Sequence, residues 1–171
     1  MFHPRRWILA AMLATTAASG IGAATMPPPT GVPASEAEGL SSGAGMGLAR
    51  SAEMNGHPGP LHVLELADAL GLTPDQRTAT EALRAAMRDR AQALGRAILE
   101  EERSLDRLFA GRVVDPAAIR ASVERIAMLR GSLRLVHLEA HLAQRRLLSA
   151  EQIARYSTLR GIAPATGHHH H

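Results

Sequence analysis

Apolar residues recur every three or four positions along two long stretches of this chain. After Thr73 they form one stripe made of Leu83, Met87, Leu94, Ile98, Leu105, Leu108 and Phe109. This spacing predicts a helix over 74–110, ended by Gly111. Asp115 and Pro116 then supply the N-cap and first residue of a second helix, so we expect the two helices to fold back as an antiparallel hairpin.

The second predicted helix carries two apolar stripes. The first comprises Ile119, Val123, Ile126, Leu129, Leu133, Val136, Ala140, Ala143 and Leu147. The second lies roughly opposite and comprises Met128, Leu135, Leu138 and Leu142. A two-helix hairpin covers only one of these faces. We therefore expect the other face to meet a second chain or the short flanking helices, and we predict a homodimer.

Two similar five-residue motifs mark helix starts at the open end of the hairpin. They are LTPDQ at 72–76 and LSAEQ at 148–152, each with a hydroxyl N-cap, an acid in the first turn and Gln at the third helical position. This is a capping box, in which the hydroxyl and the Gln amide satisfy two backbone N–H groups. With short helices expected at 61–70 and 150–160, the fold class is all-α: a long antiparallel helical hairpin flanked by two short helices.

Segments outside the hairpin have different compositions. Residues 1–24 carry Arg5 and Arg6 before an apolar run of small residues, which is typical of a cleaved secretory signal peptide and too weakly hydrophobic for a good membrane anchor. Residues 25–60 are rich in Pro, Gly and Ser and are expected to form a flexible tether. The helical-hairpin domain spans 61–161. Residues 162–171 form a His-rich tail, native or a tag remnant, and export indicates a periplasmic location.

Composition excludes several classes of function. The chain has 19 basic residues, all of them Arg, against 16 acidic residues, and without Arg5 and Arg6 the balance is close to neutral. Near-neutrality and a scarcity of aromatic rings argue against nucleic-acid binding, and the lack of Lys excludes a Walker phosphate loop. The lack of Cys excludes disulfides and thiol chemistry. GLSSG at 39–43 matches a serine-hydrolase sequence pattern but lacks the preceding strand that this pattern requires. We therefore expect that the protein is not an enzyme.

Two histidines in VHLEAHL are the strongest candidates for chemistry. His137 and His141 are four residues apart on a helix, so their imidazoles project from the same side and can share a metal ion. The motif is not the H-E-x-x-H of zinc proteases, because Glu139 points elsewhere. Spacing leaves open the alternative that both histidines are solvated polar residues beside the core.

The exported, cysteine-free hairpin bracketed by LTPDQ and LSAEQ resembles the periplasmic LTxxQ-motif family, which includes Spy, CpxP, ZraP and CnrX. The resemblance covers 61–161, and Ser149 replaces the second Thr while keeping the capping chemistry. It implies a helical, commonly dimeric and non-enzymatic protein. Such proteins act as ATP-independent chaperones, stress-pathway regulators or metal sensors.

Resemblance to the metal-sensing branch implies a set of ligands. That branch uses two histidines before the first motif, a glutamate in the long helix and an H-x-x-x-M pair before the second motif. His62 matches the first histidine, while Leu66 replaces the second. His137 matches the later histidine, and His141 stands in place of the methionine.

The oxygen ligand is less well defined by the same comparison. The family's glutamate position falls on Arg84, so Glu81, one turn earlier, is the expected carboxylate, with Glu65 as another possible donor. The implied function is a periplasmic heavy-metal sensing or resistance protein. It would hold divalent nickel, cobalt, zinc or copper through His62, His137, His141 and Glu81, and a membrane-bound regulator would read the signal.

The alternative function is a Spy- or CpxP-like ATP-independent chaperone for unfolded envelope proteins. It rests on an apolar face flanked by arginines, namely Arg84, Arg88, Arg134 and Arg145. A third possibility is a structural envelope protein whose histidines are incidental. Met54 beside His57 slightly favours copper, and the terminal His168–His171 run would bind several ions with little selectivity.

Overall fold

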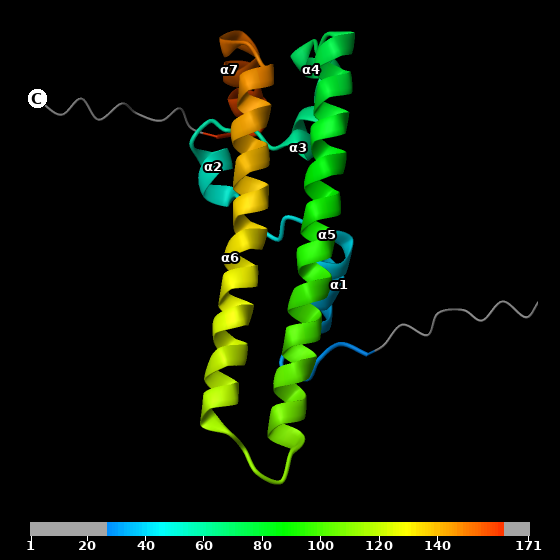
Figure 1. Cartoon of the computed structure of the whole chain (residues 1–171). Coiled ribbons are helices and arrows are strands. Elements are labelled where there is room, and N and C mark those ends of the chain that lie inside the picture. The colour runs from blue at the N-terminus through cyan, green and yellow to red at the C-terminus, as the bar shows by residue number, and fades with distance from the viewer. Residues whose placement is uncertain (1–26, 163–171) are drawn as a thin grey trace, which may run out of the picture.

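The computed structural model describes residues 27–162, which contain helices and no strands. In chain order the helices are α1 (Ala34–Ser42), α2 (Arg50–Met54), α3 (Pro60–Glu65), α4 (Ala67–Leu70), α5 (Pro74–Ala110), α6 (Pro116–Leu147) and α7 (Ala150–Leu159). Helices α5 and α6 form a long antiparallel hairpin, with the short helices around its open end and along one side (Figure 1). The all-α hairpin expected from the sequence is confirmed.

Local signals set the ends of the long helices. Thr73 accepts a hydrogen bond from the backbone N–H of Gln76 at 3.2 Å, and Asp115 accepts one from Ala117 at 2.9 Å. Both N-caps are followed by Pro, whose missing N–H costs nothing at the first helical position. The short helix expected at 61–70 is instead divided at Leu66 into α3 and α4.

The two capping boxes also join to each other. The side-chain amide of Gln76 donates to Oε1 of Gln152 at 2.8 Å, and the amide of Gln152 donates back at 2.9 Å. Gln76 further donates to the carbonyl of Leu147 at 2.8 Å, an acceptor at the end of α6. We call this arrangement the glutamine clasp. It ties the starts of α5 and α7 to the end of α6, and the sequence motifs alone did not predict it.

The flexible tether expected over 25–60 is wrong for residues 27–60, which form an ordered arm along the hairpin. In this N-terminal arm α1 lies beside α5 and α2 beside α6, and the connection crosses between them (Figure 1). Val32 and Leu40 are buried against the hairpin. Burial of these two apolar side chains provides favourable free energy for ordering the segment, which its Pro, Gly and Ser content did not indicate.

Helix α1 approaches α5 at one position that requires glycine. A Cβ at Gly95 would lie 2.0 Å from the carbonyl oxygen of Leu40, closer than any real contact. The two backbones can therefore pack directly against each other only because residue 95 has no side chain. This contact seats the arm along the middle of the hairpin.

Buried side chains form two clusters. One lies under α1 and comprises Val32, Leu40, Ala91, Ile98, Leu99, Leu133 and Val136. The other lies at the capped end and comprises Val63, Leu70, Leu148, Tyr156 and Ile162. Of the first apolar stripe of α6, Ile126 and Ala140 are also buried, but Val123 is half exposed.

The second stripe of α6 remains uncovered within one chain. Met128, Leu135 and Leu142 are 65%, 53% and 47% exposed. The homodimer stays a prediction. In the described part of the chain, no helix has the length and apolarity needed to cross a bilayer. The expected signal peptide and the residues of the tail after Ile162 lie outside that part.

Candidate metal centre

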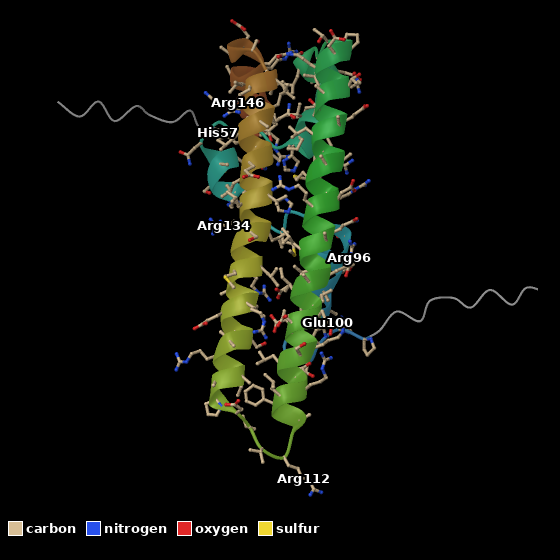
Figure 2. The ribbon with its side chains drawn as sticks, in the orientation of Figure 1. His57, Arg96, Glu100, Arg112, Arg134 and Arg146 are labelled. Carbon is tan, nitrogen blue, oxygen red and sulfur yellow. The ribbon has the colours of Figure 1, made fainter. Side chains whose placement is uncertain are left out.

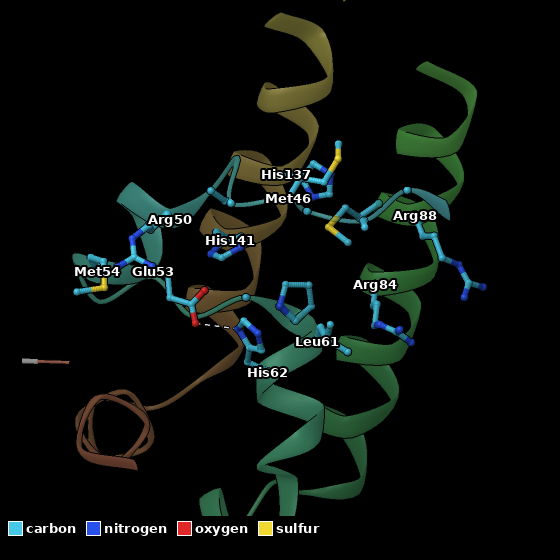
Figure 3. A pocket seen from close by; sticks show the side chains of 18 of the residues that line it. Met46, Arg50, Glu53, Met54, Leu61, His62, Arg84, Arg88, His137 and His141 are labelled. Atoms are coloured by element: carbon cyan, nitrogen blue, oxygen red, sulfur yellow. Dashed lines mark hydrogen bonds and ion pairs between the residues drawn. The ribbon is translucent and has the colours of Figure 1, made fainter. Parts of the chain in front are cut away.

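A cavity of about 820 Å³ lies between the N-terminal arm and the open half of the hairpin. Its walls come from residues 42–62 together with α5, α6 and residues 160–162, which follow α7. Figure 3 shows this region, with His137 and His141 projecting from α6 and His62 from α3. The cavity therefore brings together three of the four residues expected to bind a metal, from two separate elements.

His137 and His141 are buried, with 2% and 8% of their surfaces exposed, so the solvated alternative is wrong. Burial of His137, with His141 nearby, lowers its pKa and keeps the ring neutral. Nε2 of His137 is buried, and within residues 27–162 it has no hydrogen-bond partner. A neutral imidazole nitrogen without a partner is costly in an apo protein and suited to a metal ion.

Backbone contacts orient the second histidine. Nδ1 of His141 lies 2.8 Å from the carbonyl oxygen of His57, so Nδ1 carries the proton and donates it. Nε2 then presents a lone pair. A Cβ at Gly59 would lie 2.8 Å from that Nε2, so the glycine leaves open a space that any other residue would fill. The arm thus both sets the tautomer and keeps the nitrogen accessible.

The third histidine is oriented by a carboxylate. Nδ1 of His62 lies 2.8 Å from Oε1 of Glu53 on α2, which leaves Nε2 of His62 for another ligand. The same oxygen accepts a hydrogen bond of 2.5 Å from the hydroxyl of Tyr156 and lies 3.5 Å from Arg160. Burial acts to raise the pKa of Glu53, but these hydrogen bonds and positive charges outweigh it, so the pKa is lowered.

The expected carboxylate is not at the cavity. Glu81 and Glu65 are exposed and do not line it, whereas Arg84, at the family's glutamate position, does. Within residues 27–162 no group of three His, Asp or Glu residues lies close enough together to hold a metal ion. The four predicted ligands therefore do not form a closed coordination shell, and the histidine pair on α6 is its best-formed part.

Glu53 and Met46 both line the cavity, and sequence reasoning missed them because they lie in the segment interpreted as a tether. A signal was present: between Pro33 and Pro58 the chain has no proline, and it carries ASEAEGL and ARSAEM, which are helix-forming sequences. Averaging composition over 25–60 concealed these two stretches between the proline-rich ends.

Residues 61–160, more than half of the chain, match the LTXXQ motif family. The chain belongs to this family. No curated protein and no solved structure shows significant similarity to it. The LTXXQ match ends at Arg160 and begins after the arm, so the segment that completes the cavity lies outside the family's common region.

Membership of the LTXXQ family narrows the classes of function to consider for this chain. LTXXQ proteins are typically periplasmic, linked to stress and metals, and non-enzymatic. The match does not separate the metal-sensing members from the chaperones. The two glutamines of the motifs form the clasp at the open end of the hairpin, where it meets α6 at Leu147, nearly two helical turns beyond His141.

Proposed function

We propose that this LTXXQ protein is a periplasmic metal-binding stress protein that holds nickel, cobalt, zinc or copper through His137 and His141. The observation that carries the proposal is the buried Nε2 of His137, which lacks a hydrogen-bond partner among the described residues. Native proteins rarely leave such a group unpaired unless a ligand or water satisfies it. The space left by Gly59 in front of Nε2 of His141 supports the same reading.

His62 is the proposed third ligand. Its Nδ1 is held by Glu53, an arrangement that commonly orients a metal-binding histidine and increases the basicity of its other nitrogen. Water or a small anion would complete the coordination, because Glu81 lies outside the cavity. The ion itself would supply positive charge and bonds that draw the three histidines together.

Such an ion would connect α3, whose His62 is held by Glu53 of the arm, to the hairpin. His62 precedes the first LTXXQ motif, and the other two histidines lie on α6, so a shared ligand stabilises the arrangement in which these elements are close. A change in the mobility of the arm is a signal that a membrane-bound regulator could read. This is how we expect metal binding to serve as sensing.

Calorimetric titration with zinc, nickel, cobalt and copper at pH 7.5 tests the proposal. All proteins carry Ser in place of His168–His171, so the tail cannot bind the ions. We expect stoichiometric binding that the double variant His137→Ala/His141→Ala weakens by roughly 100-fold or more, and His62→Ala by roughly tenfold. His57→Ala is the matched control, since its side chain does not line the cavity and its carbonyl is kept. Equal binding by the double variant would refute the proposal.

The uncovered stripe of α6 is the candidate surface for either dimerisation or client binding. Met128, Leu135 and Leu142 recur every seven residues on one face, and Arg134 beside them extends away from the hairpin (Figure 2). We propose that a second copy covers this stripe, and that unfolded envelope proteins are the competing occupant. Sedimentation of Leu135→Glu distinguishes them: a monomer where the parent is a dimer supports the homodimer. Loss of aggregation suppression without a change of mass supports the chaperone.

A further inference from the structure

A tight turn of the N-terminal arm lies directly over His137. Residues 45–47 read Gly-Met-Gly, and Met46 has φ of +44°, the only positive φ of a non-glycine residue in the described part of the chain. Side chains rarely adopt this conformation, and where they do the residue often contacts a ligand. A Cβ at Gly45 would lie 3.8 Å from Nδ1 of His137, which places the turn against the imidazole.

The thioether of Met46 is held at the cavity wall. A Cβ at Gly39 of α1 would lie 2.3 Å from Sδ of Met46, so this glycine provides the space in which the sulfur sits. Met46 nevertheless remains 43% exposed and lines the cavity. Gly45, the residue before it, packs against His137, and Figure 3 labels Met46 and His137 among the residues that line the cavity. Glycine at 39, 45 and 47 thus presents one soft donor next to the buried imidazole.

The remaining donors of the cavity are also soft or neutral. Met54 and Met87 line it together with the three histidines, and Glu53 is the one carboxylate among the described residues that line it. That carboxylate is already engaged by Tyr156, His62 and Arg160. Thioether and imidazole donors without free carboxylates suit copper(I) better than nickel, cobalt or zinc.

The net charge of the side chains that line the cavity also favours copper(I). Arg50, Arg84 and Arg88 line the cavity and form no ion pair with any acidic residue of the described part, so positive charge exceeds negative charge there. Repulsion by these groups acts twice as strongly on a divalent ion as on a monovalent one. Monovalent copper also accepts as few as two or three ligands, which fits a histidine pair without a complete acidic shell.

We propose that the cavity selects copper(I), bound by the imidazoles of His137 and His141 and the thioether of Met46. This inference rests on the proposed function and names its ion. It assigns to the N-terminal arm, which lies outside the region matched by the family, a ligand that sets selectivity. Binding involves no change of oxidation state, because the ion enters as copper(I).

Competition with a chromophoric copper(I) chelator under anaerobic reducing conditions tests the ligand set. Met46→Leu removes the sulfur and keeps the volume, while Met128→Leu makes the same change on the exposed face of α6. We expect Met46→Leu to weaken copper(I) binding by roughly tenfold and leave zinc binding unchanged, and Met128→Leu to change neither. Copper(I) affinity unchanged in Met46→Leu, or an equal loss for zinc, overturns the proposal.

X-ray absorption of the copper(I)-loaded protein gives a readout that does not depend on how well the variant folds. The chain has no Cys, so any sulfur bound to copper must come from methionine. We expect one sulfur in the first shell of the parent and none in Met46→Leu. A shell of nitrogen and oxygen alone in the parent refutes the role of Met46 while leaving histidine binding intact. Failure of the proposed function would look different from failure of this inference. In that case His137→Ala/His141→Ala would bind every tested ion with the same affinity as the parent protein.

Discussion

The glutamine clasp and the cavity lie next to each other but differ in how their polar groups are satisfied. In the clasp both glutamine amides have partners within the described residues, and each bond links segments more than 70 positions apart. In the cavity the buried Nε2 of His137 has no partner among residues 27–162, and Met46 holds a left-handed backbone. The clasp thus has the features of a stability element. The cavity retains an unfavourable group that a ligand would relieve.

The largest expected effect comes from displacing the arm that forms one wall of the cavity. Gly95→Val places a side chain where the carbonyl of Leu40 now lies, and we expect a loss of about 3 kcal/mol in the free energy of unfolding. Gly131→Val is the matched control, because nothing lies within 4 Å of a Cβ there. Urea titration measures both. Similar stabilities for the two variants would show that the arm does not pack on α5 as described.

Breaking the clasp should lower stability and leave the cavity intact. Gln152→Ala removes an N-cap hydrogen bond of 2.9 Å and the two reciprocal bonds to the part-buried amide of Gln76, whose Nε2 keeps only its bond to Leu147, for a loss of about 2 kcal/mol. Gln92→Ala removes a single bond of 3.3 Å and should cost less than about 0.5 kcal/mol. Metal affinity should stay at the parent value in both. A large loss of metal affinity in Gln152→Ala would show that the cavity depends on the clasp.

As the pH falls, the protein should lose stability first through His137 in the cavity. Because the pKa of His137 is lowered, the unfolded chain binds a proton near pH 6.5 that the folded protein does not. Stability is therefore complete above that pH and falls as pH drops below it, by at most about 1.4 kcal/mol per pH unit for one proton. Thermal unfolding of the metal-free protein between pH 7.5 and 5.5 measures this slope. His137→Leu should flatten it, and an unchanged slope in that variant would assign the effect elsewhere.

The smallest expected change in stability is the one that best distinguishes the cavity from the clasp. His137→Leu replaces an unpaired buried nitrogen with an apolar group of similar size, so the metal-free protein at pH 7.5 should keep its stability or gain up to about 1 kcal/mol. Metal binding should be lost at the same time. Chemical unfolding with and without zinc checks both. A loss of more than about 1 kcal/mol in the metal-free variant would mean that His137 makes a stabilising hydrogen bond, as the clasp glutamines do.

Sequence patterns predicted some parts of the site and missed others for a consistent reason. His137 and His141 were found because their spacing is read along one helix, and His62 because the resemblance aligned it. Glu81 was chosen by register along α5, which says nothing about the direction of the side chain toward the arm. The carboxylate at the cavity is Glu53, which comes from a helix of five residues that periodicity cannot detect.

The sequence by itself determined the elements that depend on near neighbours. The capping boxes at Thr73 and Ser149 and the Asp-Pro start of α6 act within four residues, so the starts of α5, α6 and α7 followed directly. The tertiary structure alone decided the rest. Folding of the arm onto the hairpin, pairing of the clasp glutamines and burial of the histidines all join residues far apart in the sequence. The separation is 50 positions for Ser42 and Gln92, 76 for the two glutamines and 84 for His57 and His141. Local patterns carry no information on such contacts, because their free energy appears only when both surfaces lose water together.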